Sequence, residues 1–111
     1  MFQQPNRIDT LNTMAREAID ALDALPAETL RGAERDRDVC ERLVTEGDVV
    51  GEEFREVGAD LLRHLARVDP EEGFAQELDR SMRRLRDAIN ASYSMAVAFG
   101  AERATSIQQA A

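Results

Sequence analysis

Residues 69–111 read DPEEGFAQELDRSMRRLRDAINASYSMAVAFGAERATSIQQAA, and this stretch decides the fold. Its start carries a helix-capping pattern, with Asp69 as N-cap, Pro70 at the first helical position and Glu72 close behind. Apolar side chains then recur every three or four residues, as on one face of an α-helix. They are Phe74, Leu78, Met82, Leu85, Ile89, Ser92 or Tyr93, Ala96, Phe99 and Ile107. The pattern predicts one long helix near residues 70–106, since no proline follows Pro70.

Charge almost disappears in the second half of this helix. From Ala88 onward the only charged residues are Glu102 and Arg103, whereas the chain before Asp87 is crowded with charge. A helix without a polar face is covered on all sides, and small residues let neighbouring backbones approach closely. We therefore expect this half to pack against copies of itself or against a partner. The expected contact residues are Leu85, Ile89, Tyr93, Met95, Ala96, Phe99 and Ile107.

The chain upstream predicts three more helices, near residues 8–25, 27–45 and 48–67. The first has an apolar helical period of Ile8, Leu11, Ala15, Ala18 or Ile19, Leu22 and Leu25. It ends at Leu25-Pro26, because a residue before proline avoids helical geometry. The third begins at Asp48 as N-cap and presents a core stripe of Phe54, Val57, Leu61 and Leu65. The fold class is all-α: a helical hairpin or bundle of three to four helices with a long C-terminal helix. We divide it into a charged N-terminal helical region, 1–68, and a C-terminal assembly helix, 69–111.

The second helix is the weakest of the four in the sequence. Its RGAERDRD segment, residues 31–38, is charged on every side, and Gly32 lowers its helix propensity. Leu30, Ala33, Val39, Cys40, Leu43 and Val44 supply only a narrow apolar stripe. The pattern is compatible with a solvated helix or with a linker.

Composition excludes several classes of function. The chain has 111 residues and a net charge of −8, which disfavours nucleic acid and anionic membrane surfaces as partners. The charge-free residues 88–101 are too few to span a bilayer, so we expect no direct membrane insertion. The first residues, MFQQPNRIDT, show no cleavable signal pattern. One cysteine rules out an internal disulfide, and we expect neither cofactor nor metal.

Few residues are candidates for catalysis or metal binding, and we expect no enzymatic activity. Cys40 has Arg37 and Arg42 nearby, which favours a thiolate, but it also lies on an apolar stripe, where we expect a small buried side chain. Glu52, Glu53 and Glu56 fit a solvated helix face, because no Glu-x-x-His pair completes a di-metal site. His64 suggests histidine phosphotransfer as a third hypothesis. Arg67 and Val68 stand where that family has Lys and Gly.

The later part of the chain resembles the inner-rod, or needle-adaptor, subunits of bacterial type III secretion systems. A Phe-led amphipathic helix, FREVGADLLRHLA, precedes an Asp-Pro break, and INASYSMAVAFGAERATSIQQ follows in the last helix. Phe54, Val57, Asp60, Leu61, Leu65 and Ala66 match the first part, and Asn90, Ser94, Met95 and Ile107 match the last. The chain departs from the family in lacking lysine and in ending Gln-Gln-Ala-Ala. Flagellar rod and adaptor proteins share the same plan.

The resemblance implies a structural, self-associating subunit. Its partners would be copies of itself, as a homo-oligomer, and other secretion-apparatus proteins. It would be made in the bacterial cytoplasm, exported without a cleaved signal and assembled in the envelope-spanning apparatus. The alternative is a cytosolic helical-bundle adaptor, chaperone or regulator that binds one protein partner through the third and fourth helices.

Overall fold

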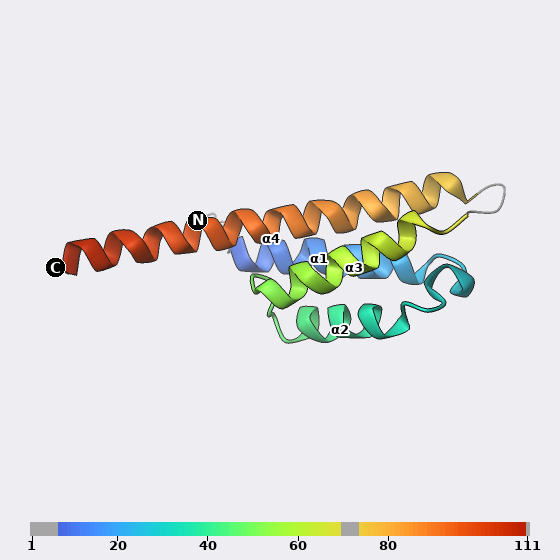
Figure 1. The fold of residues 1–111 in the computed structure, drawn as a ribbon, viewed down its shortest axis with the longest axis horizontal. Helices are drawn as coiled ribbons and strands as arrows, with labels where there is room; N and C mark the ends of the chain where they lie inside the picture. The colour runs from blue at the N-terminus through green and yellow to red at the C-terminus, as the bar shows by residue number, and fades with distance from the viewer. Residues whose placement is uncertain (1–6, 70–73, 111) are drawn as a thin grey trace, which may run out of the picture.

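Four antiparallel helices pack side by side, and the last one extends past the other three (Figure 1). The computed structural model describes residues 7–69 and 74–110, with side chains as far as Gly100. The elements are α1 (Arg7–Asp23), the 3-10 turn η1 (Ala27–Leu30), α2 (Glu34–Thr45), α3 (Glu52–Ala66) and α4 (Ala75–Ala110). No strand occurs in this part of the chain. The predicted all-α fold with a long C-terminal helix is confirmed.

The helices run alternately up and down, so each packs against its neighbours in the chain. α4 lies against α1 and α3, and α2 lies against α3 and α1. The apolar stripe expected on α1 is confirmed, because Leu11, Ala15, Ile19 and Leu22 all face inward and are buried. Residues on both sides of the predicted division at 68/69 contribute to one hydrophobic core.

The structure divides the helix that we expected over residues 27–45. The turn η1 ends at Leu30, Arg31 is extended, and Gly32 takes the left-handed conformation at φ +90°. Only glycine adopts this conformation without steric cost, so Gly32 breaks the helix instead of weakening it. Helix α2 then begins at Glu34 and is ordered, with Cys40, Leu43 and Val44 buried.

The predicted start of the third helix at Asp48 is wrong. Helix α3 begins at Glu52, with Gly51 as its N-cap. Asp48 instead completes the end of α2, where its N–H donates to the Leu43 carbonyl oxygen at 2.8 Å. Gly47, at φ +73°, donates to the Val44 carbonyl oxygen at 3.1 Å, so the two bonds form a Schellman motif.

Helix α4 begins at Ala75, five residues after the predicted start at Pro70. The Phe74 carbonyl oxygen accepts the first helical bond, from the N–H of Leu78 at 2.9 Å. Pro70 and Glu72 of the expected capping box lie outside the described residues. At the other end, α4 passes through Gly100 and continues to Ala110, beyond the expected Ser106.

Candidate assembly surface on α4

The inward face of α4 is narrower than the sequence pattern suggested. Its buried residues are Leu78, Ser81, Leu85, Ala88 and Ser92. This spacing of three or four residues follows one stripe, on which serine and alanine replace the larger apolar residues we expected. Leu85 is one of the predicted contact residues, and it is fully buried within its own chain.

Gly58 brings α3 and α4 close together. A Cβ atom at Gly58 would lie 2.9 Å from Cδ1 and 3.1 Å from Cγ1 of Ile89. Ile89, also a predicted contact residue, is therefore half-buried against α3 within the same chain. The missing side chain at Gly58 is what lets this isoleucine pack between the helices.

Ser92 of α4 forms a hydrogen bond with the connection between α2 and α3. Its hydroxyl donates to the Val49 carbonyl oxygen at 2.5 Å, and Val49 is itself buried. A guanidinium nitrogen of Arg55 donates to the Val50 carbonyl oxygen at 2.5 Å and to Ser92 Oγ at 3.3 Å. The polar groups of this connection are thus paired where the inward stripe of α4 ends.

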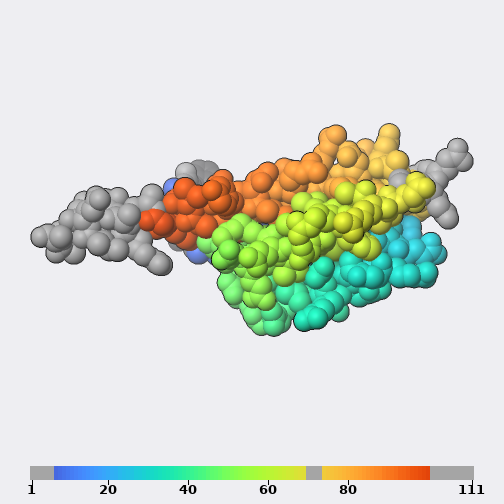
Figure 2. Space-filling view, in the orientation of Figure 1, coloured from blue at the N-terminus to red at the C-terminus, as the bar shows by residue number. Residues whose placement is uncertain are grey.

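The outer face of α4 carries large apolar side chains in the charge-free segment. Tyr93 is 62% exposed, and Val97, one turn later, is 53% exposed. Met95, Ala96 and Phe99 are half-buried. Figure 2 shows this part of α4 at the edge of the bundle surface. The side chain of Ile107 lies outside the described residues. We call the outer face around Tyr93 and Val97 the assembly surface.

The bundle ends near the middle of this segment. Arg7, Thr10, Leu11 and Met14 of α1 lie around Ala91 and Met95 of α4. Beyond this point α4 continues alone past the other helices in Figure 1. From Met95 to Ala110 a helix spans about 22 Å, at 1.5 Å per residue. The charge-free segment therefore straddles the place where α4 leaves its own bundle.

The other candidate residues have structural surroundings. Cys40 is fully buried, and burial raises the pKa of its thiol to about 12, against the lowering effect of Arg37. This confirms the prediction of a small buried side chain. His64 is half-buried, with Nε2 2.9 Å from the Thr29 carbonyl oxygen, so it joins α3 to η1. Glu52, Glu53 and Glu56 are exposed. The described residues contain no cluster of side chains suited to a metal ion.

Ionic contacts are concentrated on the face opposite α4. Arg37 of α2 reaches across to Asp23 of α1, with Nε–Oδ1 at 2.9 Å and Nη2–Oδ2 at 2.5 Å. It also contacts Asp38 and Glu41, and the hydrogen bond to Asp23 is the largest cause of the raised pKa of Arg37. This network explains how the heavily charged α2 is held against α1.

The sequence did not reveal every residue that lies where α4 packs against the other helices. The sequence placed Ser92 or Tyr93 on the apolar stripe of this helix, and Ser92 is the one that is buried, whereas Ser81 and Gly58 were not assigned to the core. Ser81 occupies a regular spacing with Leu85 and Ala88, which is the signal that would have found it. Gly58 leaves no such signal, because its role depends on the partner helix.

The chain matches no family model, no curated protein and no solved structure in the comparisons made. Within the described residues, no helix combines the length and apolar character needed to cross a bilayer.

Proposed function

We propose that this protein is a structural subunit that self-associates through the C-terminal half of α4. The observation that carries the proposal is the assembly surface, where Tyr93 and Val97 are exposed on a segment without charge. Large exposed apolar side chains that lie together on one surface are typical of interaction sites. Helices α1 and α3 fully bury only the inward stripe of this helix.

The resemblance to inner-rod subunits of type III secretion systems suggests which structure the subunit would build. In such a rod, the charged bundle would keep the unassembled subunit soluble, and α4 would supply the contacts between assembled subunits. Burial of apolar area drives the association, at about 25 cal/mol per Å² before the cost of ordering the subunits.

Val97→Asp tests the proposal without disturbing the core, since Val97 is exposed. An aspartate in a buried contact carries an unpaired charge, so we expect association to weaken at least about tenfold. Association is measured by analytical ultracentrifugation over a concentration series. Circular dichroism checks that the helix content is unchanged.

Arg35→Ala is the matched control, because it changes the net charge equally at an exposed site on α2. We expect it to associate like the unchanged chain. Equal association of the Val97→Asp and control variants would contradict the proposed surface. A chain that stays monomeric at every concentration and binds one partner in a one-to-one complex would favour the adaptor alternative.

A further inference from the structure

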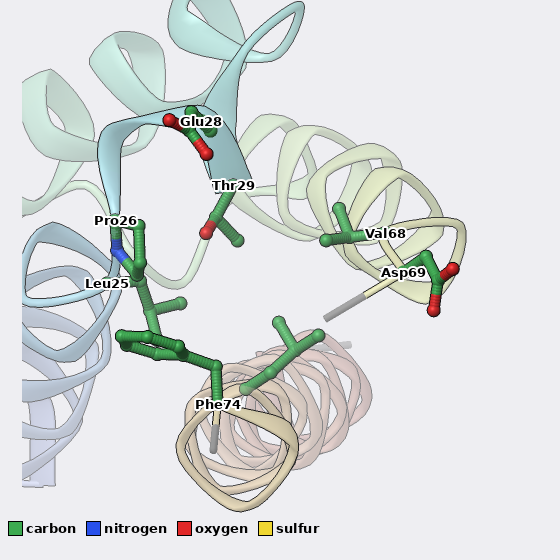
Figure 3. A pocket seen from close by; sticks show the side chains of 8 residues that line it. Leu25, Pro26, Glu28, Thr29, Val68, Asp69 and Phe74 are labelled. Atoms are coloured by element: carbon green, nitrogen blue, oxygen red, sulfur yellow. The ribbon is translucent and has the colours of Figure 1, made fainter. Parts of the chain in front are cut away.

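A small apolar pocket lies between η1, the ends of α1 and α3, and the first turn of α4. It encloses about 200 Å³ and is lined by Leu25, Pro26, Glu28, Thr29, Val68, Asp69, Phe74 and Leu78. Figure 3 shows the side chains of Leu25, Val68 and Phe74 around this space. Leu25 and Leu78 are buried, whereas Phe74 is 39% exposed, so the pocket has a buried floor and an accessible side. An apolar cavity of about 150 Å³ can hold benzene, so this pocket has room for a small organic molecule.

Thr29 places an unpaired polar group inside this pocket. The residue is only 9% exposed, and its hydroxyl forms no hydrogen bond with any part of the chain that the structure describes. Figure 3 shows the hydroxyl oxygen directed into the space between Leu25 and Val68. Buried hydroxyl groups normally have a hydrogen-bond partner, because they lose their hydration on folding. The Thr29 hydroxyl is therefore available to a molecule bound in the pocket.

The backbone of Thr29 is held on both sides. Its N–H donates to the Pro26 carbonyl oxygen at 2.9 Å. Its carbonyl oxygen lies 2.9 Å from Nε2 of His64 on α3. Since both backbone groups have partners, the hydroxyl is presented to the pocket from a fixed position, which lowers the cost of ordering a contact with it.

The charges around the pocket favour an uncharged ligand over an anion. Glu28 and Asp69 are its charged lining residues, and the described lining contains no arginine. Neither carboxylate forms an ion pair with another described residue. A carboxylate or phosphate ligand would therefore meet like charges without a cation to balance them.

We propose that this pocket binds a small uncharged organic molecule that has an apolar body and one hydroxyl group, as in a phenol. The apolar body contacts Leu25, Val68 and Leu78, and the ligand hydroxyl forms a hydrogen bond with Oγ1 of Thr29. Phe74 and Tyr93 are about 28 Å apart along α4, at 1.5 Å per residue, so the pocket is remote from the assembly surface. The inference is thus independent of the proposed self-association.

Titration of the full-length chain with phenol, followed by NMR of the methyl groups, tests the proposal. We expect saturable shifts of the Leu25, Val68 and Leu78 methyl signals, and none for Leu43 and Val44 in the core beneath α2. Benzoate, which carries a carboxylate in place of the hydroxyl, should bind at least about tenfold more weakly than phenol. Absence of saturable shifts at the pocket would overturn the proposal, because the pocket would then hold only water or part of the chain itself.

Thr29→Val keeps the shape of the side chain and removes its hydroxyl. We expect the Kd of phenol to rise about fivefold, whereas toluene, which has no hydroxyl, should bind this variant and the unchanged chain equally. Thr13→Val is the matched control, because Thr13 is an exposed threonine of α1 outside the pocket, and it should leave phenol binding unchanged. Equal binding of phenol by the Thr29→Val variant and the unchanged chain would refute the role of the hydroxyl.

Discussion

Gly58 sets the distance between α3 and α4. It lies in the buried face of α3, where Ile89 of α4 fills the space that a side chain would take. Core packing at this density tolerates little added volume. The close packing of α4 against α3 therefore depends on a residue with no side chain.

Gly58→Ala should lower the free energy of unfolding by about 1–2 kcal/mol, because the overlap with Ile89 exceeds the gain in helix propensity. Adding Ile89→Val removes Cδ1, the closest atom, and should restore part of the loss. Urea denaturation of the two single variants and the double variant measures this coupling.

Gly100→Ala is the control for that prediction. A Cβ atom there meets no other atom within 4 Å, so the substitution acts only through helix propensity. It should be neutral or stabilising by less than about 1 kcal/mol. If Gly58→Ala stabilised the protein in the same way, the close contact between α3 and α4 would be refuted.

Cys40 should be unreactive in the folded protein. Its thiol is buried, and its pKa is raised from 9.0 to about 12 chiefly by loss of hydration. At pH 8 we expect iodoacetamide to label it only after unfolding in urea. Rapid labelling of the folded chain would contradict the packing of α2 on the core.

The same shift in the pKa of Cys40 predicts how stability depends on pH. Above pH 9 the unfolded chain releases the thiol proton, whereas the folded chain retains it until about pH 12. The unfolded state then binds fewer protons, so the free energy of unfolding falls as pH rises through this window. Cys40→Ala should remove this part of the slope in urea titrations at increasing pH.

At the scale of the element, the end of α2 depends on Gly47. Its φ of +73° lets the chain close the Schellman motif that turns α2 toward α3. Gly47→Ala should cost about 1 kcal/mol, because a Cβ atom disfavours this conformation, and no neighbouring atom contributes. Gly47→Asn should cost less, since asparagine tolerates it better. Thermal unfolding compares the variants, and equal stability of all three would contradict this account.

The helices were predictable where the apolar period was strong. The stripes Leu11–Ala15–Ile19–Leu22 and Phe54–Leu61–Leu65 are buried as expected, and the third-helix residue Val57 is half-buried. Boundaries were predicted wrongly where local signals were ambiguous. Asp48 has the residue type of an N-cap, but its backbone closes the preceding helix, and Gly32 breaks a helix that we expected to continue.

The two faces of α4 could be separated only with the other helices in place. The sequence placed Leu85 and Tyr93 together as contact residues, yet Leu85 is in the core and Tyr93 is exposed. Which part of an apolar helix faces its own bundle depends on where α1 and α3 pack. The loss of charge after Asp87 was visible in the sequence, whereas the point where α4 leaves the bundle was not.

At the scale of the whole molecule, alternation of helix direction places the two ends of α4 in different surroundings. Its first turns lie beside the end of α1, where Phe74 and Arg84 line a shallow pocket of about 210 Å³. Its last turns extend beyond the bundle (Figure 1).

Sedimentation velocity of the unchanged full-length chain over a wide concentration series tests the central claim most directly. Self-association through α4 predicts a weight-average sedimentation coefficient that rises steadily with concentration. Elongated particles should appear in electron micrographs of the most concentrated sample. A single monomer peak with a constant sedimentation coefficient over the whole series would contradict the account.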